Sequence, residues 1–144
     1  MSVLRWRSSR RLVAFLFTGV LGLSACAADE RYVIIGSARA PSTSGTVEAS
    51  DAGDGRTTVA VHLDFLHPPS RLNENLKHFV VWFQPKAGKA VRAGGLKYDP
   101  SERTGDLTGT SPFHEFVVKV TAERESKPAA PSEFVIAMQE VSIE

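Results

Sequence analysis

The alternation of apolar and polar residues in the segment T-T-V-A-V-H-L-D-F, residues 57–65, constrains the fold more than any other feature of the sequence. Every second residue from Val59 to Phe65 is apolar, and the residues between them are small or polar. A period of two is typical of a β-strand that buries one face. The turn-forming residues D-A-G-D-G precede this segment and Pro68-Pro69 follow it, so both ends of the predicted strand are marked.

Other segments extend the same β-rich pattern. H-F-V-V-W-F-Q-P at 78–85 is continuously apolar, which predicts a central strand covered on both faces. Further strands are predicted at 32–35, 46–49, 89–98, 116–123 and 134–143, with a bulge at Gly94-Gly95 and a weak D-L-T-G-T segment at 106–110. No segment after residue 26 has a helical period. We therefore predict an all-β fold, an immunoglobulin-like antiparallel β-sandwich of about seven strands, with a small barrel as the alternative.

The predicted core consists of the apolar residues on the inward faces of these strands. It comprises Val59, Val61, Leu63, Phe65, Val81, Phe83, Phe116, Val118 and Val120. Trp82 is a further expected core aromatic, and its indole N–H must find a hydrogen-bond partner if it is buried. The chain has a single cysteine, so no disulfide can form within it and packing alone must hold the fold.

The N-terminal residues have the pattern of an export signal. Four arginines and no acidic residue occupy residues 1–11, and an uncharged, mostly apolar stretch follows at 12–22. That stretch is shorter than the ~20 apolar residues of an ordinary membrane span. Leu23-Ser24-Ala25-Cys26 then resembles the lipobox of bacterial lipoproteins at every position. A plain secretory signal with a chance cysteine is the alternative.

The resemblance to bacterial lipoproteins implies a cellular location and a domain organisation. In that family the thiol of the lipobox cysteine, here Cys26, receives a diacylglyceryl group. The chain is cut between Ala25 and Cys26, and the new amino terminus is acylated, typically with palmitate. This implies a signal peptide at 1–25, a lipidated cysteine and tether at 26–31, and one domain at 32–144. Membrane attachment through Cys26 implies a cell-envelope protein, and Ala27, in place of Asp, favours the outer membrane over the inner.

The charge balance changes once the signal is removed. The whole chain has 17 Lys+Arg and 16 Asp+Glu, and removing the four signal arginines leaves 13 against 16, a net charge of −3. A mildly acidic chain with mixed signs gives no electrostatic support for nucleic-acid binding. We therefore expect no nucleic-acid partner.

A second resemblance covers about residues 57–137. V-V-W-F-Q-P, G-G-L-K-Y-D and F-V-V-K-V-T-A-E-R-E-S-K-P-A-A-P-S-E resemble, in order and spacing, the extracytoplasmic domain of anti-sigma-K-type factors. Small envelope lipoproteins of soil bacteria share this pattern and an L-x-P-P-x-x-L loop, here Leu66 to Leu72. The resemblance implies a β-sandwich module. It does not imply sigma-factor control, because the cytoplasmic sigma-binding domain and membrane helix of those factors have no counterpart in this sequence.

Catalytic and metal-binding chemistry has little support in the sequence. His62 and His67 fall on opposite faces of a regular strand, no G-x-S-x-G elbow is present, and D-A-G-D-G lacks the spaced oxygen ligands of a calcium loop. Glu123 is expected to pair with a loop amide or a neighbouring cation. We expect neither an enzyme, nor a cofactor, nor a metal site.

The expected function is a non-catalytic interaction or accessory module for another envelope protein. A small-ligand or signal-sensing domain is the alternative class. The loop Pro68–Asn75 is expected at the end of the domain opposite the tether. Its predicted partner-binding residues are Arg71, Asn73 and Glu74. A competing interpretation is that this loop caps the core through Leu72 and Leu76.

Overall fold

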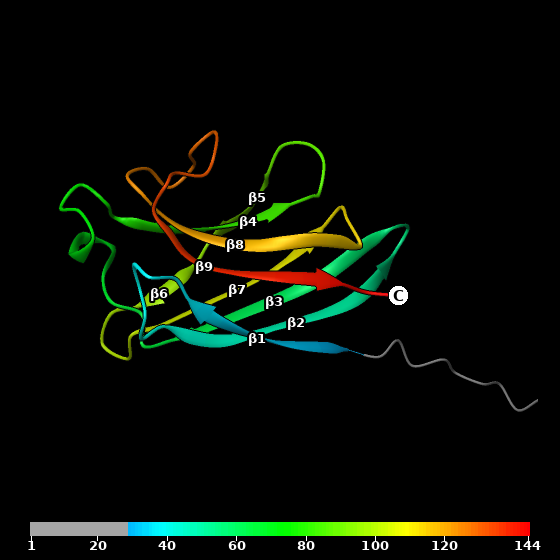
Figure 1. Cartoon of the computed structure of the whole chain (residues 1–144), viewed down its shortest axis with the longest axis horizontal. Helices are drawn as coiled ribbons and strands as arrows, with labels where there is room; N and C mark the ends of the chain where they lie inside the picture. The colour runs from blue at the N-terminus through cyan, green and yellow to red at the C-terminus, as the bar shows by residue number, and fades with distance from the viewer. Residues whose placement is uncertain (1–28) are drawn as a thin grey trace, which may run out of the picture.

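A computed structural model describes residues 29–144 (Figure 1). Its strands are β1 (Glu30–Gly36), β2 (Ser44–Gly53), β3 (Arg56–Asp64), β4 (His78–Gln84), β5 (Val91–Gly95), β6 (Lys97–Asp99), β7 (Thr104–Ser111), β8 (Glu115–Glu123) and β9 (Val135–Ser142). The all-β prediction is confirmed, with nine strands in place of about seven. In this described part of the chain, no helix has the length and apolar character needed to cross a membrane. The predicted cleavage and lipidation at Ala25 and Cys26 lie outside the described residues.

The strands form one antiparallel sheet that nearly closes on itself. Its order is β5-β4-β8-β9-β1-β2-β3-β7-β6. The edge strands β5 and β6 are consecutive in the chain, with only Leu96 between them, and β5 also lies near β7. On the other side, β9 and β1 are joined by only two residue pairs, Ile35 with Met138 and Gly36 with Ala137. In Figure 1, β4, β5 and β8 lie above β1, β2 and β3, and the core fills the space between them.

The core is formed by side chains that project inward from both halves of this sheet. Phe83 on β4 packs edge-on against Phe116 on β8, with ring centres 5.2 Å apart. The Phe83 ring also reaches across the core to β7, where a Cβ atom at Gly109 would lie 3.9 Å from it. Phe79 on β4 packs edge-on against Tyr98 on β6 at 5.3 Å. Aromatic contacts therefore tie β4 to both neighbouring and opposite strands.

Eight of the nine predicted core residues are buried, and the prediction for Phe65 is wrong because its side chain is 55% exposed. Its φ angle is 57°, in the left-handed region that a bulky residue rarely adopts. This backbone turn breaks the alternation, so that Leu66 takes the inward position and is buried. The Leu66 amide donates to the Arg103 carbonyl at 2.8 Å, and its carbonyl accepts from the Tyr98 hydroxyl at 2.8 Å. Tertiary hydrogen bonds therefore hold the bend.

Trp82 is buried on the face of β4 opposite the main core. It is 1% exposed and shares that face with buried Val80, which confirms that β4 is covered on both faces. The indole Nε1 donates to Thr121 Oγ1 at 2.9 Å, and the Thr121 hydroxyl donates to Glu123 Oε1 at 2.6 Å. The same carboxylate oxygen accepts the Ser132 amide at 2.7 Å. The expected partner of the indole is thus a threonine, and Glu123 pairs with a loop amide as predicted.

Several strands differ in extent from the prediction, among them β2, which spans Ser44–Gly53 where the sequence predicts 46–49. β7 runs over Thr104–Ser111, where the sequence predicts only a weak segment. It is a full strand because β3 pairs with it from residue 57 to residue 63 and β6 pairs with its other edge. The predicted strand at 89–98 divides into β5 and β6, and the extra residue of its bulge is Ala93, next to the predicted glycines. β1 begins at Glu30, two residues before the predicted start.

Candidate functional site

The two ends of the sheet carry different features. We define the near end by Glu30, the hairpin 51–56, the loop 85–90, the turn 111–115 and residues 142–144. We define the loop end by the segments 37–43, 65–77, 100–103 and 124–134. In Figure 1 the near end lies on the right and the loop end on the left. The predicted partner-binding loop therefore lies at the end opposite the start of β1.

Apolar residues hold this loop on the core. Pro69 begins a 3-10 turn, Pro69–Arg71, at a position where no amide donor is needed, and its side chain is buried. Leu76 is buried, and half-buried Leu72 packs against the core. The capping role is therefore confirmed for both leucines, and the polar side chains between them remain near the surface.

Of the three predicted partner-binding residues, the structure brings only Arg71 to a cavity. Arg71 is exposed, and its Nη1 donates to His67 Nδ1 at 3.2 Å. Asn73 serves the loop itself, because its Oδ1 accepts the Asn75 amide at 3.0 Å. Glu74 is exposed and does not line the cavity. The three residues therefore do not form one cluster.

The cavity beside Arg71 has a volume of about 150 Å³. We call it the loop-end cavity, and its apolar lining comes from Ala40, Pro41, Leu66, Pro68, Leu72, Phe79 and Ile136. Leu66, Phe79 and Ile136 are at most 3% exposed and belong to the main core. Because protein cores are close-packed, this floor is preformed.

The polar groups of the loop-end cavity are mainly cationic or neutral. Arg39 and Arg71 line it from two different loops, together with His67 and Ser42. The Arg39 guanidinium lies 5.1 Å from the centre of the Phe134 ring. No carboxylate lines the cavity, and within residues 29–144 neither arginine forms an ion pair. The cavity therefore joins an apolar floor to two guanidinium groups available for an anion.

Sequence reasoning missed Arg39. It lies in the segment S-A-R-A-P-S, whose small and polar residues predict only a loop. Its relation to Arg71 arises because the β1–β2 connection and the loop after β3 meet at the loop end. No local sequence signal marks that meeting.

A broader groove of about 580 Å³ lies on the outer face of β1, β2, β3, β7 and β6. His62 lines it, with Nδ1 2.6 Å from Asp106 and Nε2 3.2 Å from Asp64. The hydrogen bond with Asp106 raises the pKa of His62, and the charges of both carboxylates add to this effect, while partial burial opposes it. Arg31 forms an ion pair with Glu48 in the same groove. Since these charges largely satisfy one another, the groove is the weaker candidate despite its size.

Three large apolar side chains are exposed beside the join of β1 and β9. Val33 is 69%, Ile35 68% and Met138 53% exposed. Val33 and Ile35 share one face of β1, and Ile35 is the partner of Met138 across the join. Exposed apolar groups of this kind occur at interaction surfaces. The side chains of this stripe carry no charge that would define a partner.

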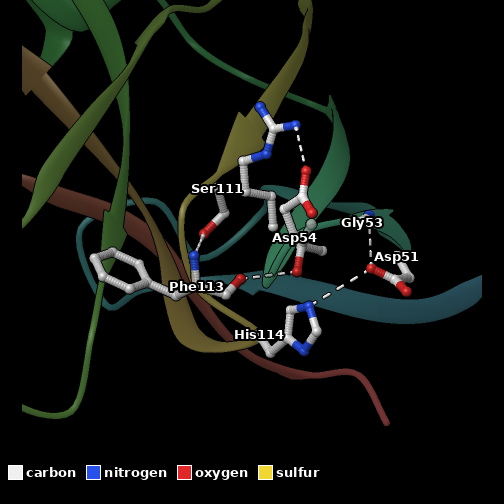
Figure 2. A network of polar contacts seen from close by, with 8 residues as sticks. Asp51, Gly53, Asp54, Ser111, Phe113 and His114 are labelled. Atoms are coloured by element: carbon white, nitrogen blue, oxygen red, sulfur yellow. Dashed lines mark hydrogen bonds and ion pairs between the residues drawn. The ribbon is translucent and has the colours of Figure 1, made fainter.

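Turn contacts organise the near end (Figure 2). The Asp51 carboxylate accepts the Gly53 amide at 2.8 Å and lies 3.6 Å from His114 Nε2. The Thr57 hydroxyl donates to the Phe113 carbonyl at 2.8 Å, which joins β3 to the turn 111–115. Over residues 29–144, no group of three or more His, Cys, Asp or Glu side chains is placed to hold a metal ion.

Comparison with known proteins gives no relative for this chain. No family model, no curated protein and no solved structure matches it. The resemblance of residues 57–137 to anti-sigma-K-type domains therefore stays a prediction from sequence motifs. Function has to be inferred from the residues and their geometry.

Proposed function

We propose that the mature protein is a lipid-anchored, non-catalytic interaction module of the cell envelope that binds another envelope protein through its loop end. The observation that supports this most directly is that the start of β1 and the loop-end cavity lie at opposite ends of the fold. β1 starts at the near end, whereas the loop-end cavity, with its apolar floor and two arginines, lies at the opposite end. A domain anchored at one end and carrying a preformed cavity at the other is suited to recognition.

The fold we infer is an immunoglobulin-like sandwich, as the sequence predicts. One layer would contain β5, β4, β8 and β9, and the other β1, β2, β3, β7 and β6. The short join of two residue pairs between β9 and β1 supports this division, as does the core between the two halves.

The tether supports the proposed orientation. Three residues, 27–29, separate Cys26 from Glu30 at the start of β1, and three extended residues reach at most about 11 Å. Two or more acyl chains hold a protein stably in one leaflet. The near end would then face the lipid headgroups, in the outer membrane if Ala27 acts as it does in related signals. The loop end is left accessible to a partner.

Affinity capture from membranes in mild detergent, followed by mass spectrometry, tests this function. The double variant Arg71→Ala, Glu74→Ala should lose a partner that the wild type retains. Its melting midpoint should stay almost unchanged, because both side chains are exposed. The matched control, Asp54→Asn with Lys89→Ala, removes two exposed charges at the near end, keeps a residue type that tolerates the positive φ angle of position 54, and should keep the partner. Equal capture by both variants would contradict recognition through the loop end.

The loop-end cavity, with its apolar floor, also favours a second candidate function, the sensing of a small molecule. Native mass spectrometry of the detergent-extracted lipoprotein separates the two. A stoichiometric small ligand with no protein partner supports sensing, and a protein partner with an empty cavity supports the interaction module.

A further inference from the structure

We propose that the loop-end cavity receives a single large apolar side chain of the partner protein, flanked in that partner by a carboxylate that pairs with Arg39 and Arg71. This inference rests on the proposed interaction function and names the chemistry of the partner. The occupant is therefore an acidic-apolar segment of an envelope protein.

The volume of the cavity sets the size of the apolar group. A cavity of about 150 Å³ lined by Leu, Ile and Phe is large enough to hold benzene. The floor of the loop-end cavity consists of the same residue types, Leu66, Leu72, Phe79 and Ile136. One phenylalanine or leucine side chain therefore matches it. Because the floor is part of the packed core, little ordering is needed when the side chain enters.

The two arginines set the charge of the flanking group. Arg39 belongs to the segment between β1 and β2, and Arg71 ends the 3-10 turn after β3, so they approach the cavity from separate loops. A guanidinium presents a planar set of donors that matches a carboxylate. Arg71 already uses one donor on His67 Nδ1, and Arg39 lies over the Phe134 ring, so neither charge is neutralised by an ion pair within residues 29–144.

The apolar floor and the two arginines of the loop-end cavity are arranged like a binding hot spot. An apolar anchor that fills a desolvated pocket, surrounded by a polar rim, supplies most of the affinity in many protein interfaces. Nucleic acid fits this surface poorly, because only two arginines line the cavity and the mature chain is mildly acidic. A partner side chain with an adjacent carboxylate satisfies both the floor and the rim.

The first arm of the test uses small probes on the mature lipoprotein in phosphatidylcholine nanodiscs. The probe 3-phenylpropanoate joins a phenyl ring to a carboxylate, 3-phenylpropanamide keeps the ring without the charge, and propanoate keeps the charge without the ring. Methyl NMR of labelled Leu and Ile should show shifts at Leu66, Leu72 and Ile136 with 3-phenylpropanoate. For a fragment of this size we expect a Kd on the order of 1 mM. The amide should bind about two- to tenfold more weakly, and propanoate should not shift these methyl groups.

Variants separate the rim from the floor. Arg39→Gln or Arg71→Gln should reduce the preference for the carboxylate over the amide, while Arg56→Gln at the near end should leave it unchanged. All three arginines are exposed, so the fold should persist in each variant. Equal binding of the carboxylate and the amide to the wild type would overturn the anionic part of the proposal. Absence of any shift at the three methyl groups would overturn the cavity as a binding site.

The second arm asks whether the partner itself occupies the cavity. Saturating 3-phenylpropanoate should release the captured envelope protein from the detergent-extracted lipoprotein, and 3-phenylpropanamide at the same concentration should release less. If the probe binds but the partner stays, the proposed occupant is wrong, although the interaction function stands. If the probe binds and no protein partner is captured by the wild type, the interaction function itself fails.

Discussion

Replacing Trp82 gives the most direct test of how this fold is held. The side chain is 1% exposed, and a buried tryptophan removes about 150–250 Å² from water. At about 25 cal/mol per Å², this corresponds to about 4–6 kcal/mol as an upper bound. Measured aromatic-to-alanine costs are about 3–5 kcal/mol. We therefore expect Trp82→Ala to lower the free energy of unfolding by about 4 kcal/mol, a large part of the 5–15 kcal/mol typical of a domain.

The assay is urea unfolding of a chain that begins at residue 27, followed by circular dichroism, because Trp82 is the one tryptophan of residues 27–144 and its loss removes the fluorescence reporter. Arg92→Ala is the matched control, since Arg92 is exposed and is the partner of Trp82 on β5. It should change stability by less than about 0.5 kcal/mol. A cycle of Trp82→Phe and Thr121→Val should give a coupling energy of about 1 kcal/mol for their hydrogen bond. A loss below about 1 kcal/mol for Trp82→Ala would refute the burial of this side chain.

Three further predictions concern β1, the outer groove and the anchor. Ile34→Ala should lower the free energy of unfolding by about 2–5 kcal/mol and Ile35→Ala by less than about 1 kcal/mol, because the Ile34 side chain is 0% and the Ile35 side chain 68% exposed. Urea unfolding measures both losses. Equal losses would contradict the assignment of Ile34 to the buried face and Ile35 to the exposed face of β1. The raised pKa of His62 stabilises the fold below the unfolded pKa near 6.5, and this contribution fades as pH rises through the folded value. His62→Gln should therefore destabilise the protein by up to about 1 kcal/mol at pH 5.5 and less at pH 8.5, and a larger loss at the higher pH would reverse the assigned sign. Cys26→Ser should abolish lipidation and leave uncleaved precursor on immunoblots, and a matured, membrane-bound variant would exclude the lipoprotein assignment.

The sequence by itself determined the class of the fold and most of its core. The alternation from Val59 to Leu63 and the continuous apolar run of β4 reflect which side chains avoid water. The order of apolar and polar residues within each segment is enough to indicate those side chains. Turn residues such as D-A-G-D-G act locally too, and positive φ angles at Gly53, Asp54 and Gly55 form the hairpin where it is predicted. These features could be predicted because neighbouring residues alone decide them.

Only the tertiary structure decided the features that depend on distant partners. The polar, glycine-containing segment of β7 becomes a strand because β3 and β6 supply its hydrogen bonds from both sides. Phe65 leaves the core because hydrogen bonds of Leu66 to Arg103 and Tyr98 stabilise a left-handed bend. The loop-end cavity likewise combines the segment 39–42, the loop after β3, and single residues of β4 and β9. No local pattern specifies such a cavity, because its volume and charge arise where separate loops meet over a shared core.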